Sequence, residues 1–99
     1  MIRGTTPTLK FTLPFNTSEL TDVWITFAQN HKTIIEKTLD DCQCEDNVIT
    51  LILSQKDTLI LDDSYRVQIQ IRAKTNGDNA IASVIFSETV KRILKDGEI

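Results

Sequence analysis

Residues 64–74 read SYRVQIQIRAK, and this stretch decides the fold. Apolar side chains occupy every second position from Tyr65 to Ala73, and polar or charged side chains fill the positions between them. Successive side chains of a β-strand point to opposite faces, so the alternation predicts one apolar and one polar face. A helix fits poorly, because Gln68 and Arg72 would interrupt its apolar stripe. The stretch therefore predicts a half-buried antiparallel strand whose apolar face is covered by another sheet.

Further alternating stretches run along the rest of the chain. The first begins at Thr8 and ends at Pro14, which cannot donate to a ladder and suits an edge strand. We predict other strands over residues 22–29, 33–38, 47–53 and 80–86, the last continuing in looser alternation through residues 87–94. A bulge or crossover near Ser87 and Glu88 would explain the irregular register of that last stretch.

Turn signals separate these strands. Residues 30–32 predict a hairpin turn, and Asn76-Gly77 is the strongest hairpin signal in the sequence. Ser54 is a good N-cap for a single helical turn, with Asp57 in the position that Glu prefers in a capping box. The acidic residues 39–46 predict a solvated loop between strands.

About seven short strands, with no helix long enough for a βαβ crossover, predict an all-β fold. We expect one domain, residues 1–99, built as an antiparallel two-sheet sandwich. The sandwich is expected to be immunoglobulin-like in size, without the Cys…Trp…Cys core of antibody domains. The terminal segments, residues 1–6 and 95–99, are expected to lie outside the sandwich as arms that could order on a partner.

The composition is that of a globular protein, with 40% hydrophobic and 25% charged residues. A formal net charge of -3 argues against nucleic-acid binding, which usually needs a basic surface. No apolar run approaches the roughly 18 residues that a membrane span needs. The polar residues 5–8 stand where a signal peptide would have its apolar region. We therefore expect neither secretion by that route, nor insertion in a membrane, nor binding to nucleic acid.

Cys42 and Cys44 are the only cysteines, and one residue separates them. A disulfide between them would close a small, strained ring. A zinc site would need more ligands, but the chain has no Cys-x-x-Cys and a single histidine, His31. The acidic residues 39–46 lack the residue order and the glycine of an EF-hand loop. We therefore predict free thiols, no bound metal and no cofactor.

No residue pattern typical of catalysis stands out. Any Ser-His-Asp or Cys-His site would have to use His31, and no nucleophile elbow surrounds a serine. The three glycines are scattered, so no phosphate-binding loop is present. The acidic pairs at residues 40–41 and 62–63 are typical of solvated turns rather than of a general acid and base. We therefore expect no enzymatic activity and assign no catalytic, cofactor-binding or metal-binding residues.

Two strand faces leave alternatives open. Trp24 is expected to pack in the core, and the alternative is a surface aromatic that anchors a partner. Arg66, Arg72 and Lys74 could contact an anion, although such a row is more often the wet face of an antiparallel sheet. A carbohydrate-binding module would need several exposed aromatics in a row, and Trp24 and Tyr65 are the only aromatic residues other than phenylalanine.

Both ends of the chain and one middle segment carry a family resemblance. The segments are MIRGTTPT at residues 1–8, FTLPF at 11–15, KTLDDC at 37–42 and RILKDG at 92–97. With them, the chain resembles small proteins encoded in phage and prophage tail regions, similar to the N-terminal immunoglobulin-like domain of upper baseplate (receptor-binding-complex) proteins. The chain ends at residue 99, without the coiled or receptor-facing regions that follow in the larger baseplate proteins.

The resemblance implies a β-sandwich that serves as a structural or accessory module of a phage tail or baseplate. Its expected partners are other tail or baseplate proteins, or a second copy that associates through an edge strand. Such a protein is made in the bacterial cytoplasm and can become associated with the virion. The alternative function is a carbohydrate-binding or adhesion module, and a small enzyme is the least favoured class.

Overall fold

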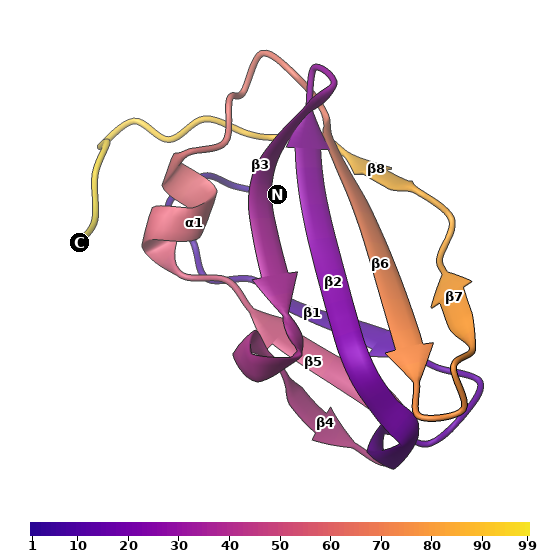
Figure 1. Ribbon diagram of the computed structural model, residues 1–99. Helices are drawn as coiled ribbons and strands as arrows, with labels where there is room; N and C mark the ends of the chain where they lie inside the picture. Colours follow the sequence, from indigo (N-terminus) through magenta and orange to yellow (C-terminus); the bar gives the residue numbers. More distant parts are fainter.

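The computed structural model describes residues 1–99 as two antiparallel β-sheets that pack face to face (Figure 1). The strands are β1 (Thr8–Thr12), β2 (Leu20–Gln29), β3 (Lys32–Thr38), β4 (Gln43–Glu45), β5 (Val48–Ile52), β6 (Val67–Thr75), β7 (Ala80–Ala82) and β8 (Phe86–Glu88). The smaller sheet has the order β1-β5-β4, and the larger has the order β3-β2-β6-β7, with β8 also paired to β6. The predicted all-β class and the two antiparallel sheets are confirmed.

β6 has the alternation that the sequence predicts. Its buried apolar residues are Val67, Ile69, Ile71 and Ala73. β2 pairs with one edge of β6, while β7 and β8 pair with the other. The strand begins at Val67 rather than at Ser64, because the Asp62 carboxylate accepts a hydrogen bond from the Ser64 N–H at 2.8 Å. That bond draws the preceding residues into a turn and leaves Tyr65 exposed before the strand.

The core lies between the two sheets and draws on both. Its fully buried side chains include Val23, Ile25 and Phe27 of β2, Ile49 and Leu51 of β5, and Leu53 just beyond β5. Because the inner face of β2 is taken by these residues, Trp24 lies on the outer face and is 49% exposed. The expectation that Trp24 packs in the core is therefore wrong, and Trp24 lies on the surface.

The connections follow the predicted turn chemistry in part. Asn30 and His31 both have positive φ, as the central residues of a tight hairpin turn require, and they join β2 to β3. Residues 76–79 join β6 to β7 as the Asn-Gly signal predicts, although Asp78 rather than Gly77 has the positive φ. The predicted loop over residues 39–46 is instead a 3-10 turn, η2 (Leu39–Asp41), followed by β4, which pairs with β5.

The single helical turn predicted at Ser54 is α1 (Gln55–Leu59). The Ser54 N–H donates to the Asp57 carboxylate at 2.9 Å, and the Asp57 N–H donates to Ser54 Oγ at 3.1 Å. Asp57 therefore completes a capping box in place of Glu. A second 3-10 turn, η1 (Thr17–Glu19), precedes β2. None of the helical segments has the length and apolarity that a membrane-spanning helix requires.

The N-terminal residues belong to the folded body rather than to a free arm. The Lys91 N–H donates to the Met1 carbonyl at 2.8 Å, and the Arg3 N–H donates to the Lys91 carbonyl at 3.0 Å. The Arg3 guanidinium donates to the carbonyls of Leu59 at 2.7 Å and Leu61 at 2.9 Å. The expectation that residues 1–6 lie outside the sandwich is therefore wrong. Residues 95–99 leave the sandwich and pass beside α1, where the Ile99 N–H donates to Gln55 Oε1 at 2.8 Å (Figure 1).

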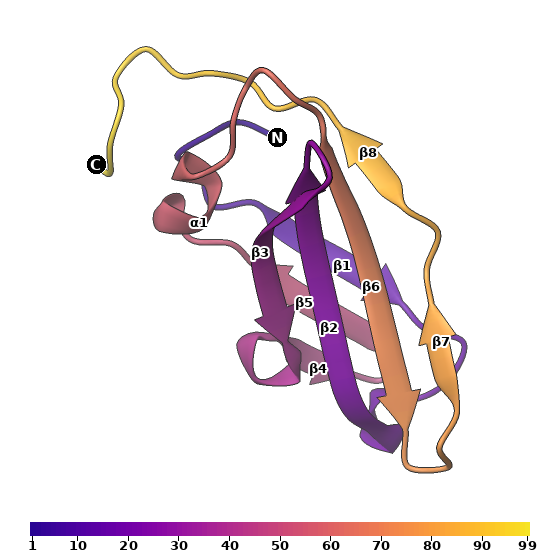
Figure 2. The same ribbon diagram turned by 45° about the horizontal axis from the view of Figure 1, so that its top comes forward.

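The edge strand beside β6 is interrupted. β7 and β8 follow one another along the outer side of β6 (Figure 2). Between the register pairs Arg72↔Ala82 and Ile69↔Phe86, two residues of β6 face the three residues 83–85. The continuous strand predicted over residues 80–86 thus breaks into two short strands. The irregularity lies at residues 83–85 rather than near Ser87 and Glu88, and the chain leaves the sheet after Glu88.

Candidate binding groove

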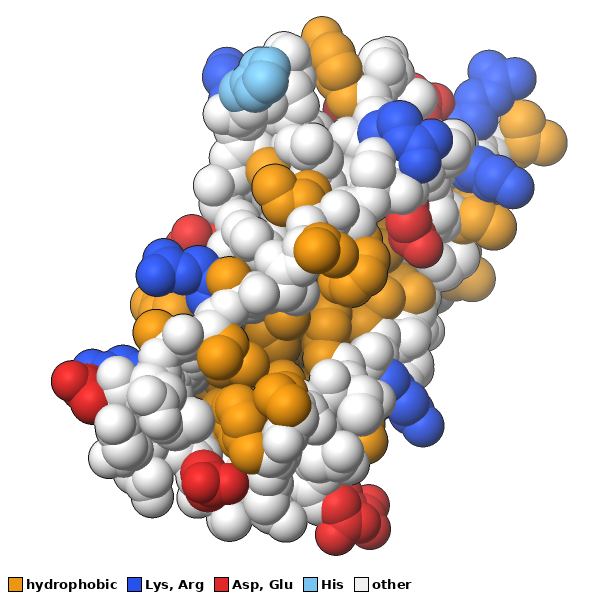
Figure 3. Space-filling view, turned by 90° about the vertical axis from the view of Figure 1, so that its right-hand side faces the viewer, with side chains coloured by type: hydrophobic (Ala, Val, Ile, Leu, Met, Phe, Trp, Pro, Cys, Tyr) orange, Lys and Arg blue, Asp and Glu red, His pale blue; other side chains and the backbone are white.

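On one side of the molecule, the two sheets leave the core partly uncovered. β1 is the edge of the smaller sheet, while β7 and β8 form an edge of the larger sheet, and the two edges are not paired with each other. A hollow of about 380 Å³ lies between β1 and β7, and a second of about 380 Å³ lies between β1 and β8. Lys10, Phe11 and Phe86 line both hollows, so together they form one groove. Figure 3 shows apolar side chains gathered in this hollowed face.

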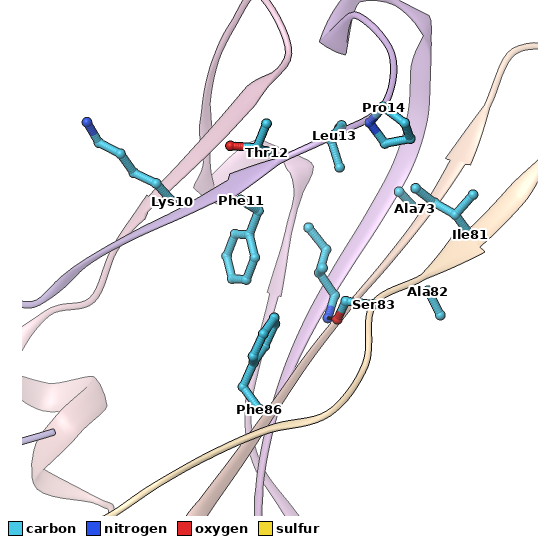
Figure 4. Close-up of a pocket in the computed structure, with 11 residues that line it drawn as sticks. Lys10, Phe11, Thr12, Leu13, Pro14, Ala73, Ile81, Ala82, Ser83 and Phe86 are labelled. Carbon is cyan, nitrogen blue, oxygen red and sulfur yellow. Dashed lines mark hydrogen bonds between the residues drawn. The ribbon is translucent and has the colours of Figure 1, made fainter.

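The walls and floor of the groove are mainly apolar. Phe11 from β1 and Phe86 from β8 point toward one another from opposite walls (Figure 4). Ile69, Ile71 and Ala73 of β6 form the floor between them. The floor residues are buried, but Phe86 remains 47% exposed because no strand closes over it. The groove can therefore bury further apolar side chains.

The outer edge of β1 carries unpaired backbone groups. Hydrogen bonds from the Leu13 N–H to the Asn47 carbonyl and from the Leu53 N–H to the Pro7 carbonyl mark both ends of the β1–β5 ladder. Residues that bond to β5 alternate with residues that do not. The backbone groups that face the open edge are therefore those of Thr8, Lys10 and Thr12. An edge of this kind can accept another strand.

The opposite rim projects apolar side chains into solvent. Val84 and Ile85, in the interruption between β7 and β8, are 74% and 58% exposed. They directly precede Phe86, whose side chain lines both hollows of the groove. Exposed apolar side chains beside an apolar groove can mark an interaction site.

One charge of each sign stands on the two walls. Lys10 extends from β1, and Glu88 lies on β8, and both line the same half of the groove. Lys10 has no carboxylate within ion-pair distance. Glu88 Oε2 lies 3.7 Å from the amino nitrogen of Met1. The groove is thus apolar inside and carries opposite charges on its opposite walls.

Trp24 forms a separate surface feature on the outer face of the larger sheet. It pairs with Arg72 of β6 and Thr38 of β3. A shallow hollow of about 260 Å³ that Asp22 and Arg72 help to line lies on one side, and one of about 150 Å³ beside Asp40 lies on the other. An exposed indole with charged neighbours is typical of a binding surface.

The residues considered for catalysis or metal binding do not come together. No group of three or more His, Cys, Asp or Glu side chains is arranged to hold a metal ion. His31 is in the exposed β2–β3 turn. Asp41 and Asp62 accept hydrogen bonds from the N–H groups of Thr38 and Ser64, each at 2.8 Å, so the acidic pairs serve local turns.

Cys42 and Cys44 are both free thiols. Burial, and then the nearby charges of Cys44 and Asp41, raise the pKa of Cys42 to about 11. The Cys42 Sγ donates to the Thr38 carbonyl at 3.4 Å. Cys42 is therefore protonated near neutral pH and serves as a packing residue rather than as a nucleophile.

The groove was not predicted from the sequence, although the sequence contains a signal for it. Residues 84–86 are three consecutive apolar residues, which breaks the alternation expected of a half-buried strand. Only the pairing shows why: Val84 and Ile85 leave the ladder and face solvent. The unpaired edge of β1 depends likewise on which strands meet in three dimensions.

Comparisons of the chain with protein-family models, with curated proteins and with solved structures found no match.

Proposed function

We propose that this chain is a non-enzymatic module, an immunoglobulin-like sandwich that joins a larger protein assembly through the groove between β1 and β7–β8. The observation that carries the proposal is the groove itself. An apolar hollow with Phe11 and Phe86 on opposite walls runs beside a strand edge with free backbone groups. Such a surface costs solubility unless a partner covers it.

The chemistry of the groove favours a protein partner. An extended segment of another chain can pair with β1 through backbone hydrogen bonds and insert alternate side chains between the sheets. Both kinds of contact match what the groove offers. A nucleic acid would require a basic surface, and Lys10 is the only cation among the lining residues.

The setting follows from the sequence resemblance. The segments at residues 1–8, 11–15, 37–42 and 92–97 resemble proteins of phage and prophage tail regions. We therefore propose that the partners are tail or baseplate proteins. The chain would be made in the bacterial cytoplasm and incorporated in the virion. The groove supports binding to another protein, and the resemblance supports a phage tail or baseplate as the assembly in which it binds.

The experiment is co-purification with single substitutions. The full chain is co-expressed with each tail and baseplate protein encoded beside it and retrieved by an affinity tag. Phe86→Asp puts a charge in the groove and should abolish retrieval. The matched control is Ile60→Asp, because Ile60 is 59% exposed and follows α1, away from the groove. The proposal would be overturned if the unmodified chain neither retrieved any of these proteins nor bound a second copy of itself.

A second candidate function uses Trp24. Its exposed indole, between two shallow hollows with Asp22, Arg72 and Asp40 nearby, is suited to stack on a sugar ring while charged groups bond its hydroxyls. The platform has one ring. Trp24 pairs with Arg72 in the second half of β6, whereas Tyr65 lies before the start of that strand and so is not beside Trp24. Binding on a glycan array that Trp24→Ala abolishes and Phe86→Asp leaves intact would favour this carbohydrate-binding alternative.

A further inference from the structure

We infer that the groove is occupied by a second copy of this chain, related by a two-fold axis that runs along the groove. In this dimer, β1 of each copy lies against the β7–β8 edge of the other. The inference rests on the proposed function, since it names the partner for the same groove. Three properties of the groove support it, namely shape, charge and symmetry.

The groove and its rim are complementary in shape. A two-fold interface uses the same surface on both copies, so that surface must contain both hollows and projecting groups. The face around the groove has both. The hollow between Phe11 and Phe86 can receive side chains, and Val84 and Ile85 project from the adjoining rim. Each copy therefore offers the apolar side chains that the groove of the other copy lacks.

The charges select the direction of the axis. An axis along the groove exchanges its two walls, so Lys10 of one copy faces Glu88 of the other, and the contact occurs twice. An axis across the groove would instead pair β1 with β1. Lys10 is the middle residue of β1, so that pairing would place the two lysines opposite each other. Like charges directly opposite in a ladder are destabilising.

The symmetry also makes use of the free strand edges. The unpaired backbone groups of Thr8, Lys10 and Thr12 would face the interrupted edge of the partner copy. A stable interface buries about 1,200 Å² in total, about half of it on each copy. Each copy supplies two strand edges and the apolar surface between them. Together the two copies provide the kind of surface that a stable interface buries. One dimer would cover both of the strand edges that flank the groove, and its two-fold symmetry would close this interface on itself.

The test is the oligomeric state of the full chain and of charge variants. Sedimentation velocity up to about 100 μM should show a reversible dimer. Lys10→Glu and Glu88→Lys should each weaken the dimer by about tenfold or more, and the double variant should restore most of the loss. The matched control Lys32→Glu is on β3, away from the groove, and should have no effect. Rescue distinguishes a contact between copies from the loss of the Glu88 contact to Met1.

A second variant makes the test independent of charge. Ile85→Asp should give a monomer with an unchanged circular dichroism spectrum, whereas Ile60→Asp should remain dimeric. A chain that is monomeric at every concentration, or a dimer that Ile85→Asp and the charge variants leave intact, overturns the inference. If the unmodified chain is monomeric but still retrieves a tail protein, and Phe86→Asp abolishes that retrieval, the proposed function survives. If it retrieves none, both fail.

Discussion

Ser83 bonds to both backbone groups of Ile71. The Ser83 N–H donates to the Ile71 carbonyl at 2.9 Å, and the Ser83 Oγ accepts from the Ile71 N–H at 3.1 Å. The Ser83 Oγ thus takes the place of the backbone carbonyl that would accept a hydrogen bond from the Ile71 N–H in an uninterrupted strand. This pair of bonds lets the edge open beside the groove without leaving a buried N–H of β6 unpaired.

Replacement of Ser83 should therefore destabilise the protein more than an ordinary surface change. Ser83→Ala removes the acceptor of a buried N–H, which costs about 1–3 kcal/mol. The control Ser64→Ala alters an exposed serine whose hydroxyl makes no hydrogen bond, and it should change stability by less than about 0.5 kcal/mol. Urea unfolding measures both. Equal midpoints for the two variants would show that Ser83 does not hold the interrupted edge.

Substitutions along β6 should follow the two faces of the strand. Ile69→Ala and Ile71→Ala remove buried side chains and should each cost about 2–5 kcal/mol. Gln68→Ala changes an exposed residue and should stay within about 0.5 kcal/mol. Gln70→Ala should fall between them at about 1 kcal/mol, because Gln70 Nε2 donates to the Ser83 carbonyl at 2.9 Å. Denaturant midpoints in the reverse order would contradict this assignment.

The sequence predicts the layers of this fold well, because alternation reports burial directly. β6, β2 and β5 each bury one face. The inward residues of β6 were identified from the sequence, whereas the inward faces of β2 and β5 were not assigned and Trp24 was expected inside. Alternation cannot choose between two apolar faces of one strand. In β2, the aliphatic face with Val23 and Ile25 is inside, and the indole of Trp24 is outside.

The groove and the N-terminal contacts could not be predicted in the same way. Both depend on pairings between distant residues. Arg3 is polar and lies in a segment with Gly4 and Pro7, so local chemistry indicates an arm. Only the fold brings Arg3 to the carbonyl groups of Leu59 and Leu61, which accept hydrogen bonds from its guanidinium. No local sequence pattern indicates these hydrogen bonds.

Those contacts predict a stabilising role for Arg3. Arg3→Gln should lower the free energy of unfolding by about 1.5–3 kcal/mol, because two partly buried carbonyls lose a charged donor. Arg92→Gln is the matched control, since Arg92 is exposed and its guanidinium makes no hydrogen bond or ion pair. Deletion of residues 1–6 should destabilise at least as much as Arg3→Gln. A truncated chain as stable as the full chain would refute the role of this segment.

Asp57 should make the stability depend on pH in the acid range. Burial opposes its ionisation, but hydrogen bonds from Ser54 and the ammonium group of Lys37 at 3.1 Å hold the pKa of Asp57 below its ordinary value of 3.8. A lowered folded-state pKa means stability that is fully present well above 3.8 and is lost as the pH falls through the folded-state value. Asp57→Asn should therefore destabilise at neutral pH, and its difference from wild type should shrink in acid.

Thermal unfolding of both proteins between neutral and strongly acidic pH measures this difference. Asp63→Asn is the control, because Asp63 is exposed and makes no ion pair. A constant difference between Asp57→Asn and wild type across the pH range would mean that the charge of Asp57 does not contribute.

The two thiols should differ in reactivity in the folded protein. The thiolate is the reactive form, and burial together with the charges of Cys44 and Asp41 raises the pKa of Cys42 to about 11. Cys44 is exposed on β4 and should react with a thiol reagent much faster near neutral pH. Mass spectrometry of a time course should therefore find Cys44 modified first, and urea should make both thiols react at similar rates. A protein that reacts fully only after a chelator is added, or that is purified with stoichiometric zinc, would instead indicate that the thiols bind metal.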